Sequence, residues 1–429
     1  MIYEIIKQNS LKNPEKIALI INDEKYTYQN IINLVDNYKF QPFKNANVAL
    51  LKTGIDLIVS FLHSSKLQYN IIPLPIETKN INIDVDYINE KHLKTTKRDF
   101  KYILVSTSGS TSEPKPIVLN EEVKLKRIEI AKNSYNLNEN DNILISTPLY
   151  HSLAIRGVLM SLVLNATGVV LTKFTPKTYL QTIQDKKITF TFSVSSQLEA
   201  IENIIQNYDV NSIKSMVSSS YSINPDIKQQ LLKYFNIYEC YGTSEIGCVT
   251  HLTPQDIKTH PNSVGKPLNG VKIKIDNGEI VVKSPWKAIE YYNISPINEW
   301  FYTGDLGEIK DGYLYYKGRT KELIKTGGIS VYPMDIEKVL LEMKGIKEVA
   351  VIGVDDSYFG EAIIAVIVGD VKKSEVMRYA QKNLLSYQVP LFYDIVDSLP
   401  KNSMGKLQKF KLKEKYNHLD IGKRLKGIR

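Results

Sequence analysis

The fold is constrained most by a regular alternation of two hydrophobic patterns in the first half of the chain. Short apolar runs rich in β-branched residues occupy residues 47–51, 102–105, 142–145 and 168–171. Between and after them, apolar residues recur at spacings of three and four in residues 55–64, 122–133, 153–164, 197–206 and 225–234. The first pattern is typical of buried strands and the second of helices. Their alternation predicts an α/β fold with largely parallel sheets.

After Gly265 the predicted strands become shorter and are separated by turn residues. Asn277-Gly278 lies between two strand-like segments and Asp311-Gly312 between two more, so each pair predicts a β-hairpin. Beyond Arg319 a new series of strand and helix patterns begins. We therefore expect a large domain at residues 1–319 and a small one at residues 320–429, joined by a short connection.

Length, composition and cysteine content exclude several classes of protein. With 429 residues, of which 43% are apolar and 24% charged, the chain is globular rather than disordered or fibrous. Two cysteines, Cys240 and Cys248, and six scattered histidines provide neither a disulfide framework nor a four-ligand zinc site. No apolar stretch reaches the roughly 18–20 residues of a membrane span, and the first residues do not resemble a signal peptide. We expect a cytoplasmic protein without integral membrane association.

The net charge of +9 is concentrated at the end of the chain. Residues 401–429 hold ten Lys and Arg against Glu414 and Asp420, a balance of +8, which leaves +1 for the first 400 residues. Only seven of the 55 basic residues are Arg, and no zinc-finger, basic-zipper or RNP-type motif is present. These features argue against nucleic acid as a partner.

Three polar clusters have a chemical interpretation beside a structural one. Residues 106–115 combine hydroxyls, Gly and a terminal Lys after a predicted strand. This composition is typical of a loop that binds polyphosphate, and it also fits a plain solvated loop. Tyr241-Gly-Thr-Ser-Glu245 offers a ring for stacking a base and a carboxylate for Mg²⁺, or forms a plain strand-to-loop turn. Asp305 follows a Gly turn, where it can accept hydrogen bonds from the paired hydroxyls of a ribose.

Taken in order, these clusters resemble the motifs of the adenylate-forming (AMP-binding) superfamily of acyl-CoA synthetases, peptide-synthetase adenylation domains and luciferases. The resemblance extends to residues 148–151, 218–223, 318–321 and 399–406, and so covers nearly the whole chain. It implies a large N-terminal α/β domain with parallel-rich sheets and a small distorted β-barrel. A small, mobile C-terminal α+β domain would follow, rotating about a hinge at Lys321.

The resemblance implies a role for each matched residue. The β- and γ-phosphates of ATP would be held by Thr107, Ser108, Gly109, Ser110, Thr111 and Lys115. Adenine and the α-phosphate would lie against Ser219, Ser220, Tyr221, Tyr241, Gly242, Thr243 and Ser244, and the ribose against Asp305 and Arg319. Glu245 would ligate Mg²⁺, and Gly327 and Gly328 would line the channel for the thiol of CoA.

Two further residues would act on the acyl group. Lys406 would bridge the reacting carboxylate and the α-phosphate, where negative charge accumulates during adenylation. His151 would be a gate between the acyl pocket and the thiol, or is a buried histidine at a helix start. Side chains that line the acyl pocket, or belong to the ordinary core, are Phe192, Ser195, Tyr221 and Cys240. The chain departs from the family pattern at Ser112, Pro116, Ser219 and Ser220, each of which replaces a usual Gly.

We therefore expect an ATP-dependent acyl-CoA synthetase with ATP, Mg²⁺ and CoA as cofactors. It would activate a carboxylic acid, which we expect to be a fatty acid, as acyl-AMP and transfer the acyl group to CoA. One alternative is an adenylation enzyme that loads an acyl carrier protein. Another is a non-catalytic acyl- or nucleotide-binding regulator, which Ser112 and Pro116 suggest. Residues 325–328 and 331–333 resemble CoA ligases more than carrier-loading domains, which favours CoA. The five matched residues Lys115, Glu245, Asp305, Arg319 and Lys406 argue against the regulator. We expect a monomer or a homodimer.

Overall fold

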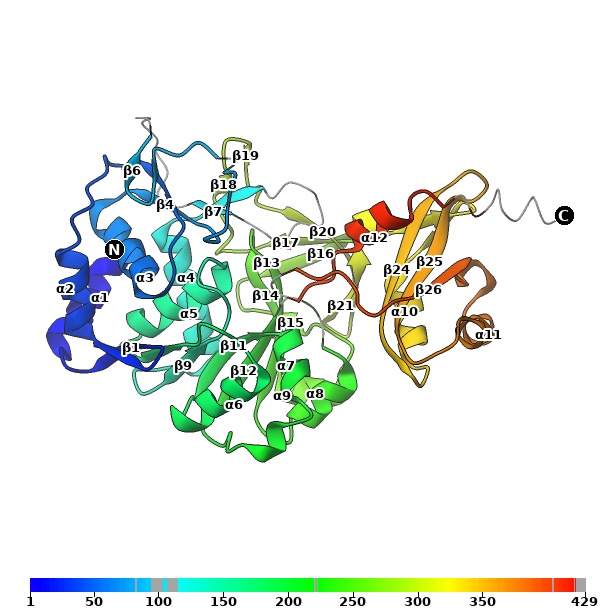
Figure 1. Cartoon of the computed structure of the whole chain (residues 1–429), viewed down its shortest axis with the longest axis horizontal. Coiled ribbons are helices and arrows are strands. Elements are labelled where there is room, and N and C mark those ends of the chain that lie inside the picture. The colour runs from blue at the N-terminus through cyan, green and yellow to red at the C-terminus, as the bar shows by residue number, and fades with distance from the viewer. Residues whose placement is uncertain are drawn as a thin grey trace. The chain divides into compact units, whose positions relative to one another are not determined.

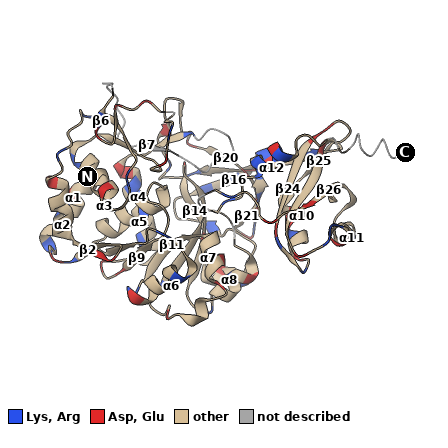
Figure 2. Ribbon diagram, viewed as in Figure 1, with Lys and Arg blue, Asp and Glu red and all other residues tan. Residues whose placement is uncertain are grey.

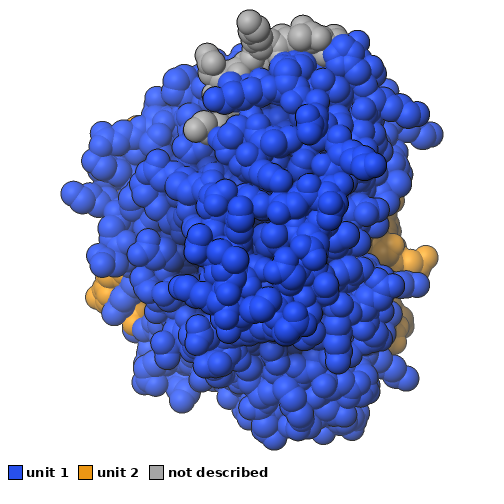
Figure 3. Space-filling model, turned by 90° about the vertical axis from the view of Figure 1, so that its left-hand side faces the viewer, with its two compact units in different colours: residues 1–109, 113–272, 283–301 blue, residues 110–112, 273–282, 302–429 orange. Residues whose placement is uncertain are grey.

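The computed structural model describes residues 1–81, 83–93, 103–105, 115–219, 221, 223–402, 405–419 and 421 (Figure 1). These residues form two compact units. Unit 1 holds the described residues of 1–109, 113–272 and 283–301, and unit 2 those of 273–282 and 302–429 (Figure 3). The sequence analysis placed the domain boundary between residues 319 and 320 because it expected a hinge at Lys321. That boundary stays a prediction.

A nine-stranded sheet forms the centre of unit 1. Its strands, in spatial order, are β15 (Lys266–Pro267), β14 (Gly247–Leu252), β13 (Ile237–Thr243), β12 (Ser215–Ser219), β11 (Phe190–Val194), β9 (Asn142–Ile145), β10 (Thr167–Val170), β1 (Ile17–Ile21) and β2 (Glu24–Thr27). The six strands from β13 to β1 are parallel, and β14, β15 and β2 are antiparallel to their neighbours. The predicted α/β class is confirmed.

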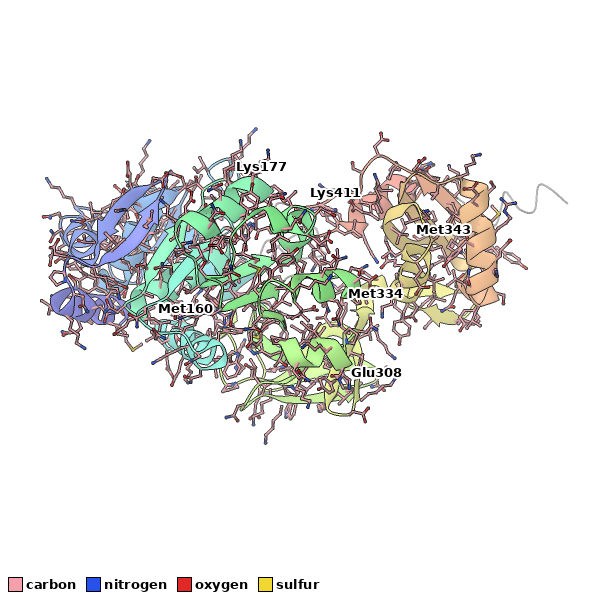
Figure 4. The ribbon with its side chains drawn as sticks, turned by 90° about the horizontal axis from the view of Figure 1, so that it is seen from below. Met160, Lys177, Glu308, Met334, Met343 and Lys411 are labelled. Carbon is pink, nitrogen blue, oxygen red and sulfur yellow. A yellow bond between two sulfur atoms is a disulfide. The ribbon has the colours of Figure 1, made fainter. Side chains whose placement is uncertain are left out.

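Helices pack on both faces of this sheet, because side chains alternate between the faces of a strand. Ile143 and Ile145 contribute to the core beside α1 (Ile2–Lys12), α2 (Tyr28–Asp36), α3 (Gly54–Leu67), α4 (Glu121–Tyr135) and α5 (Ser152–Val163). Leu144, between them, contributes to the core beside α6 (Pro176–Asp185), α7 (Ser195–Ile201), α8 (Pro225–Leu231) and α9 (Pro254–Thr259). Met160, labelled in Figure 4, is completely buried in the first core.

Two small sheets complete unit 1. One has the order β4 (Asn70–Pro73), β3 (Asn47–Leu50), β5 (Tyr87–Ile88) and β6 (Lys91–His92). The other has the order β19 (Ser295–Pro296), β18 (Glu290–Tyr291), β8 (Pro116–Val118) and β7 (Ile103–Val105). In the second sheet Tyr291 pairs with Ile117. This pairing brings a late part of unit 1 beside the strand that follows Lys115.

Unit 2 contains both predicted hairpins in one sheet. Its order is β16 (Lys272–Asp276), β17 (Glu279–Lys283), β20 (Phe301–Lys310) and β21 (Tyr313–Arg319). A 3₁₀ turn, Thr320–Glu322, follows β21 at once. Glu308, labelled in Figure 4, pairs with Lys310 and Lys317 on this sheet.

A second sheet in unit 2 carries the C-terminal helices. It has the order β23 (Ile329–Val331), β22 (Ile324–Thr326), β25 (Gly360–Gly369) and β24 (Ile346–Asp356), and β26 (Phe392–Ile395) also pairs with β25. The helices are α10 (Pro333–Leu341), α11 (Lys373–Asn383) and α12 (Lys409–Tyr416). Lysines gather on α12 (Figure 2), where Lys409 pairs with Glu337 at 2.7 Å and Lys413 with Glu361 at 3.5 Å. In the described part of the chain, no helix has the length and apolarity that crossing a membrane requires.

Candidate active site

The motif predicted to bind adenine and Mg²⁺ lies on the hairpin of β13 and β14. This hairpin requires glycine at positions 242 and 247. A Cβ on Gly242 would lie 1.9 Å from the backbone oxygen of Gly247. Gly247 itself has φ +72°, and a Cβ there would lie 2.7 Å from the Trp286 ring. The chain can therefore make this tight turn only because both positions lack a side chain.

Arg127, which the sequence analysis did not single out, fixes the loop of this hairpin. Its Nη2 donates to the carbonyl oxygens of Ser244 at 3.1 Å and Glu245 at 3.2 Å, and its Nε donates to that of Trp286 at 3.0 Å. Burial and the charge of Arg156 lower the pKa of Arg127, whereas Glu245 raises it. A buried guanidinium on α4 thus holds the backbone that presents Glu245.

The Glu245 carboxylate and Lys115 meet the same aromatic ring. Tyr291 donates from its hydroxyl to Oε1 of Glu245 at 3.0 Å, and Lys115 Nζ lies 5.5 Å from the centroid of the Tyr291 ring. Burial, and then the charge of Glu245, raise the pKa of Tyr291, so it stays a neutral donor. The end of the predicted phosphate loop therefore lies near the predicted Mg²⁺ ligand.

The donors at this hairpin fit a magnesium–phosphate group. Carboxylate oxygens are ligands that Mg²⁺ prefers, and Glu245 supplies two. Beside it, Thr243 Oγ1 is buried and has no hydrogen-bond partner among the described residues, so a polar group of a ligand would satisfy it. Cys240 and Cys248, near His251, are bonded to each other as a disulfide and so are not thiolate ligands. This bond joins the two strands of the hairpin.

Other predicted residues of unit 1 lie at strand ends or helix starts. His151 is buried at the N-cap of α5, and burial lowers its pKa to about 4, so it is neutral at pH 7. Ser195 Oγ donates to the Ser219 carbonyl at 3.1 Å and also contacts the Tyr221 carbonyl. Tyr221 donates its hydroxyl to Glu199 at 2.9 Å. Ser195 therefore pins the segment to which the resemblance assigns adenine contacts.

Unit 2 brings three of its predicted residues together. Asp305 and Arg319 are paired across β20 and β21, and Arg319 Nε lies 2.6 Å from Asp305 Oδ1. Burial and the charge of Arg319 lower the pKa of Lys406, while Asp305 and Glu322 raise it. The predicted ribose-binding pair and the predicted catalytic lysine thus belong to one electrostatic group within unit 2.

The predicted hinge and thiol-channel residues are exposed in unit 2. Lys321 lies in the 3₁₀ turn, directly after the strand that carries Arg319. Gly327 and Gly328 make the turn between β22 and β23 with φ +57° and +81°. Thr107, Ser108, Gly109, Ser110, Thr111 and Ser220 lie outside the described residues. Roles for all of these positions stay predictions.

Comparison with known proteins identifies the family. Residues 59–292, more than half of the chain, match the model of the AMP-binding enzyme family, and residues 335–406 match that of the AMP-binding enzyme C-terminal domain. The chain belongs to the AMP-binding enzyme family. The superfamily resemblance seen in the motifs is thereby confirmed.

Curated relatives of this AMP-binding enzyme are acyl-CoA ligases. The uncharacterized acyl-CoA ligase YhfT of Bacillus subtilis is 29% identical over 378 residues, which are 84% of this chain and 78% of the relative. A long-chain-fatty-acid–CoA ligase of the same organism is 30% identical over 342 residues, which are 73% of this chain and 61% of the relative.

A solved structure shares the fold. The o-succinylbenzoate coenzyme A synthetase of Bacillus subtilis, in complex with ATP and magnesium ion, superimposes with a TM-score of 0.84 at 23% identity. The match covers 95% of this chain and 99% of that one. At this identity the likeness confirms the predicted architecture of a large α/β domain and a small C-terminal domain.

Proposed function

We propose that this AMP-binding enzyme is an AMP-forming acyl-CoA ligase. It would join a carboxylic acid to the α-phosphate of ATP, releasing pyrophosphate, and then transfer the acyl group to the thiol of CoA, releasing AMP. The observation that carries the proposal is the convergence of Lys115 and Glu245 on Tyr291. A cation for the phosphates and a carboxylate for Mg²⁺ are the two charges that ATP chemistry needs side by side.

Each group in unit 1 has a defined task under this proposal. Glu245 holds Mg²⁺, which when bound would neutralise charge on the phosphates. Lys115 contacts the departing phosphates, and Tyr291 keeps the Glu245 carboxylate oriented by its hydrogen bond. Tyr241 stacks on adenine from the hairpin that Arg127 fixes. His151, being neutral, excludes water and orders the acyl group without carrying a proton.

The matched residues of unit 2 have proposed roles of their own. The Asp305 carboxylate accepts from the ribose hydroxyls, and Arg319 holds that carboxylate in place. The Lys406 ammonium stabilises the charge that develops as the acid attacks the α-phosphate. We propose that residues 320–429 then rotate about Lys321, so that Gly327 and Gly328 line the path of the CoA thiol.

The proposal also covers the thiol that accepts the acyl group and the class of the substrate acid. We take CoA as the acceptor, because the relatives are CoA ligases; a carrier protein would be the alternative acceptor. We propose a fatty acid as the substrate. The names of the relatives specify long-chain fatty acids in one case and 2-succinylbenzoate in another, so the relatives act on more than one class of acid.

A pyrophosphate-release screen tests the proposal. Short, medium, long and aromatic carboxylates are each offered with ATP and Mg²⁺, with and without CoA, to the parent chain and to Glu245→Ala. We expect acid-dependent release from the parent, thioester only when CoA is present, and loss of release in the variant. No release with any acid would reject the proposal in favour of a non-catalytic binding protein.

A further inference from the structure

The disulfide between Cys240 and Cys248 encloses the motif to which the resemblance assigns adenine and Mg²⁺. Cys240 directly precedes Tyr241, and Cys248 directly follows Gly247, so the bond closes a loop around residues 241–247. The two Cα atoms lie 6.2 Å apart, a separation that a disulfide can bridge without moving the backbone. Every nucleotide contact predicted for this hairpin therefore lies inside one covalent ring.

The bond crosses an irregularity in the pairing of β13 with β14. Tyr241 pairs with Thr250, but the next residue, Gly242, pairs with Cys248, so one residue of β14 is left over as a bulge. Cys240 lies on one side of this bulge and Cys248 on the other. A bulge sets the direction in which the neighbouring side chains point, and here the disulfide fastens it.

Two non-covalent anchors hold the tip of the same loop. Arg127 donates to the carbonyl oxygens of Ser244 and Glu245, and Tyr291 donates to the Glu245 carboxylate. The disulfide instead holds the base of the loop, beside Tyr241. Opening the disulfide would therefore leave the tip in place and free the base, so that nucleotide binding weakens while the hairpin stays folded.

The two sulfur atoms differ in their access to solvent. Cys240 is partly exposed, whereas Cys248 is buried, with 6% of its surface exposed. A thiol from solvent therefore reaches Cys240 and displaces Cys248. The sequence analysis expects a cytoplasmic protein, and a disulfide in that compartment is more often redox-sensing than structural.

Two arginines place positive charge near the buried sulfur. Cys248 follows Gly247, where an added Cβ would lie 3.0 Å from Arg127 Nε. Burial, and then the charge of Arg156, lower the pKa of His251, and a ring nitrogen of His251 lies within 4.8 Å of both sulfur atoms. Positive surroundings stabilise a thiolate, so Cys248 is suited to be the leaving group.

We propose that Cys240 and Cys248 are a redox-modification site that sets the affinity of this hairpin for MgATP. The proposal rests on the proposed function, because that function places the nucleotide at the hairpin. The co-reactant is a dithiol. One of its thiolates attacks Cys240 Sγ, the bond between the cysteines breaks, and Cys248 leaves as a thiolate that takes up a proton. The second thiolate of the dithiol then attacks the mixed disulfide, and Cys240 leaves in the same way.

The exchange is balanced and reversible. Two electrons and two protons pass from the dithiol, which becomes a disulfide, to the two cysteines. A small disulfide such as glutathione disulfide reverses the reaction and is itself reduced to two thiols. The oxidised protein is the form that binds MgATP tightly, and the reduced protein is the form that binds it weakly.

Defined redox states of the protein test this proposal. The parent is treated with glutathione disulfide or with dithiothreitol, and maleimide labelling reports whether both cysteines are free. The control carries Cys240→Ser and Cys248→Ser together; because the chain has two cysteines, the control has no thiol on which the reagents can act. A second control with alanine at both positions separates the loss of the bond from an effect of serine. Each sample is measured for its Kd for MgATP, its melting temperature and its release of pyrophosphate.

We expect reduction of the parent to raise the Kd for MgATP by roughly 2- to 10-fold, which is the cost of ordering one freed side chain. Its melting temperature without nucleotide should fall by roughly 3–6 °C, because the open chain loses the restraint of a nine-residue ring. Both double variants should match the reduced parent and ignore the reagents. Equal affinity in the two redox states, or cysteines that label fully after treatment with glutathione disulfide, would overturn the proposal.

Pyrophosphate release separates this proposal from the proposed function. No release with any acid in either redox state rejects the ligase, whereas a redox-dependent affinity for MgATP that both double variants lack would still support the redox site. Acid-dependent release with equal MgATP affinity in the two states rejects the redox site and leaves the ligase standing. No binding of MgATP in either state rejects both.

Discussion

Replacing Arg127 with Met should destabilise unit 1 and weaken its response to MgATP. Arg127 is buried on α4 and donates to three backbone carbonyls, two of them in the loop that carries Glu245. Met keeps the length and apolar volume of the side chain but removes every donor. The carbonyls of Ser244, Glu245 and Trp286 would then lose a charged partner.

The size of the effect follows from these contacts. Nη2 is shared between two carbonyls at 3.1 and 3.2 Å and counts as about one bond, and Nε provides a second at 3.0 Å. Two hydrogen bonds to a charged donor contribute about 3–6 kcal/mol. Removing a buried charge returns part of its desolvation cost, which leaves a net loss of about 2–4 kcal/mol. For a unit of this size, the melting temperature should fall by roughly 3–7 °C.

Thermal melts of the parent, Arg127→Met and the control Arg378→Met, each with and without MgATP, measure both effects. The control removes an exposed positive charge from unit 2. We expect the lower melting temperature only in Arg127→Met, together with a smaller nucleotide-induced rise. A variant that melts like the parent and gains the same stability from MgATP would refute the role given to Arg127.

Three further predictions concern the same region. Tyr291→Phe should keep the fold but raise the Mg²⁺ concentration needed for half-maximal activity several-fold, because Glu245 loses its orienting bond; an unchanged Mg²⁺ titration would argue against that bond. Gly242→Ala should unfold the hairpin, because the new Cβ would lie 1.9 Å from the Gly247 oxygen. A parent-like melting temperature would show that the two strands are not this close at Gly242. His251 has a pKa lowered to about 4 by burial and then by Arg156, against an ordinary 6.5, so the unfolded chain binds its proton first as pH falls. Stability should therefore drop between pH 6.5 and about 4, and drop less in His251→Phe; equal losses in parent and variant would contradict this.

The sequence predicted the elements well where periodicity was strong. The helix expected at 153–164 is α5, Ser152–Val163, and the Asn277-Gly278 and Asp311-Gly312 turns join paired strands. The helix expected at 197–206 is instead α7, Ser195–Ile201, followed by a 3₁₀ turn at Ile205–Asn207. Apolar spacing alone cannot distinguish a continuous helix from two short turns that bury the same side.

The supporting residues of the site could not be predicted in this way. Arg127 sits within a helical pattern and Tyr291 in a two-residue strand, so neither belongs to a local motif. Their contacts with the Glu245 loop cross more than 40 residues of sequence, and only the tertiary fold brings them together. The available signal for Arg127 was a basic residue on the apolar side of α4.

We propose that this one chain catalyses two half-reactions, and a variant of Lys406 separates them most directly. In single-turnover experiments on Lys406→Ala, acyl-adenylate formation is measured from acid and ATP, and thioester formation from supplied acyl-adenylate and CoA. The ammonium acts on charge that develops only in the first step, so we expect that step to slow by about 100-fold or more while the second proceeds at the parent rate. Equal slowing of both steps in a variant that melts like the parent would contradict the account.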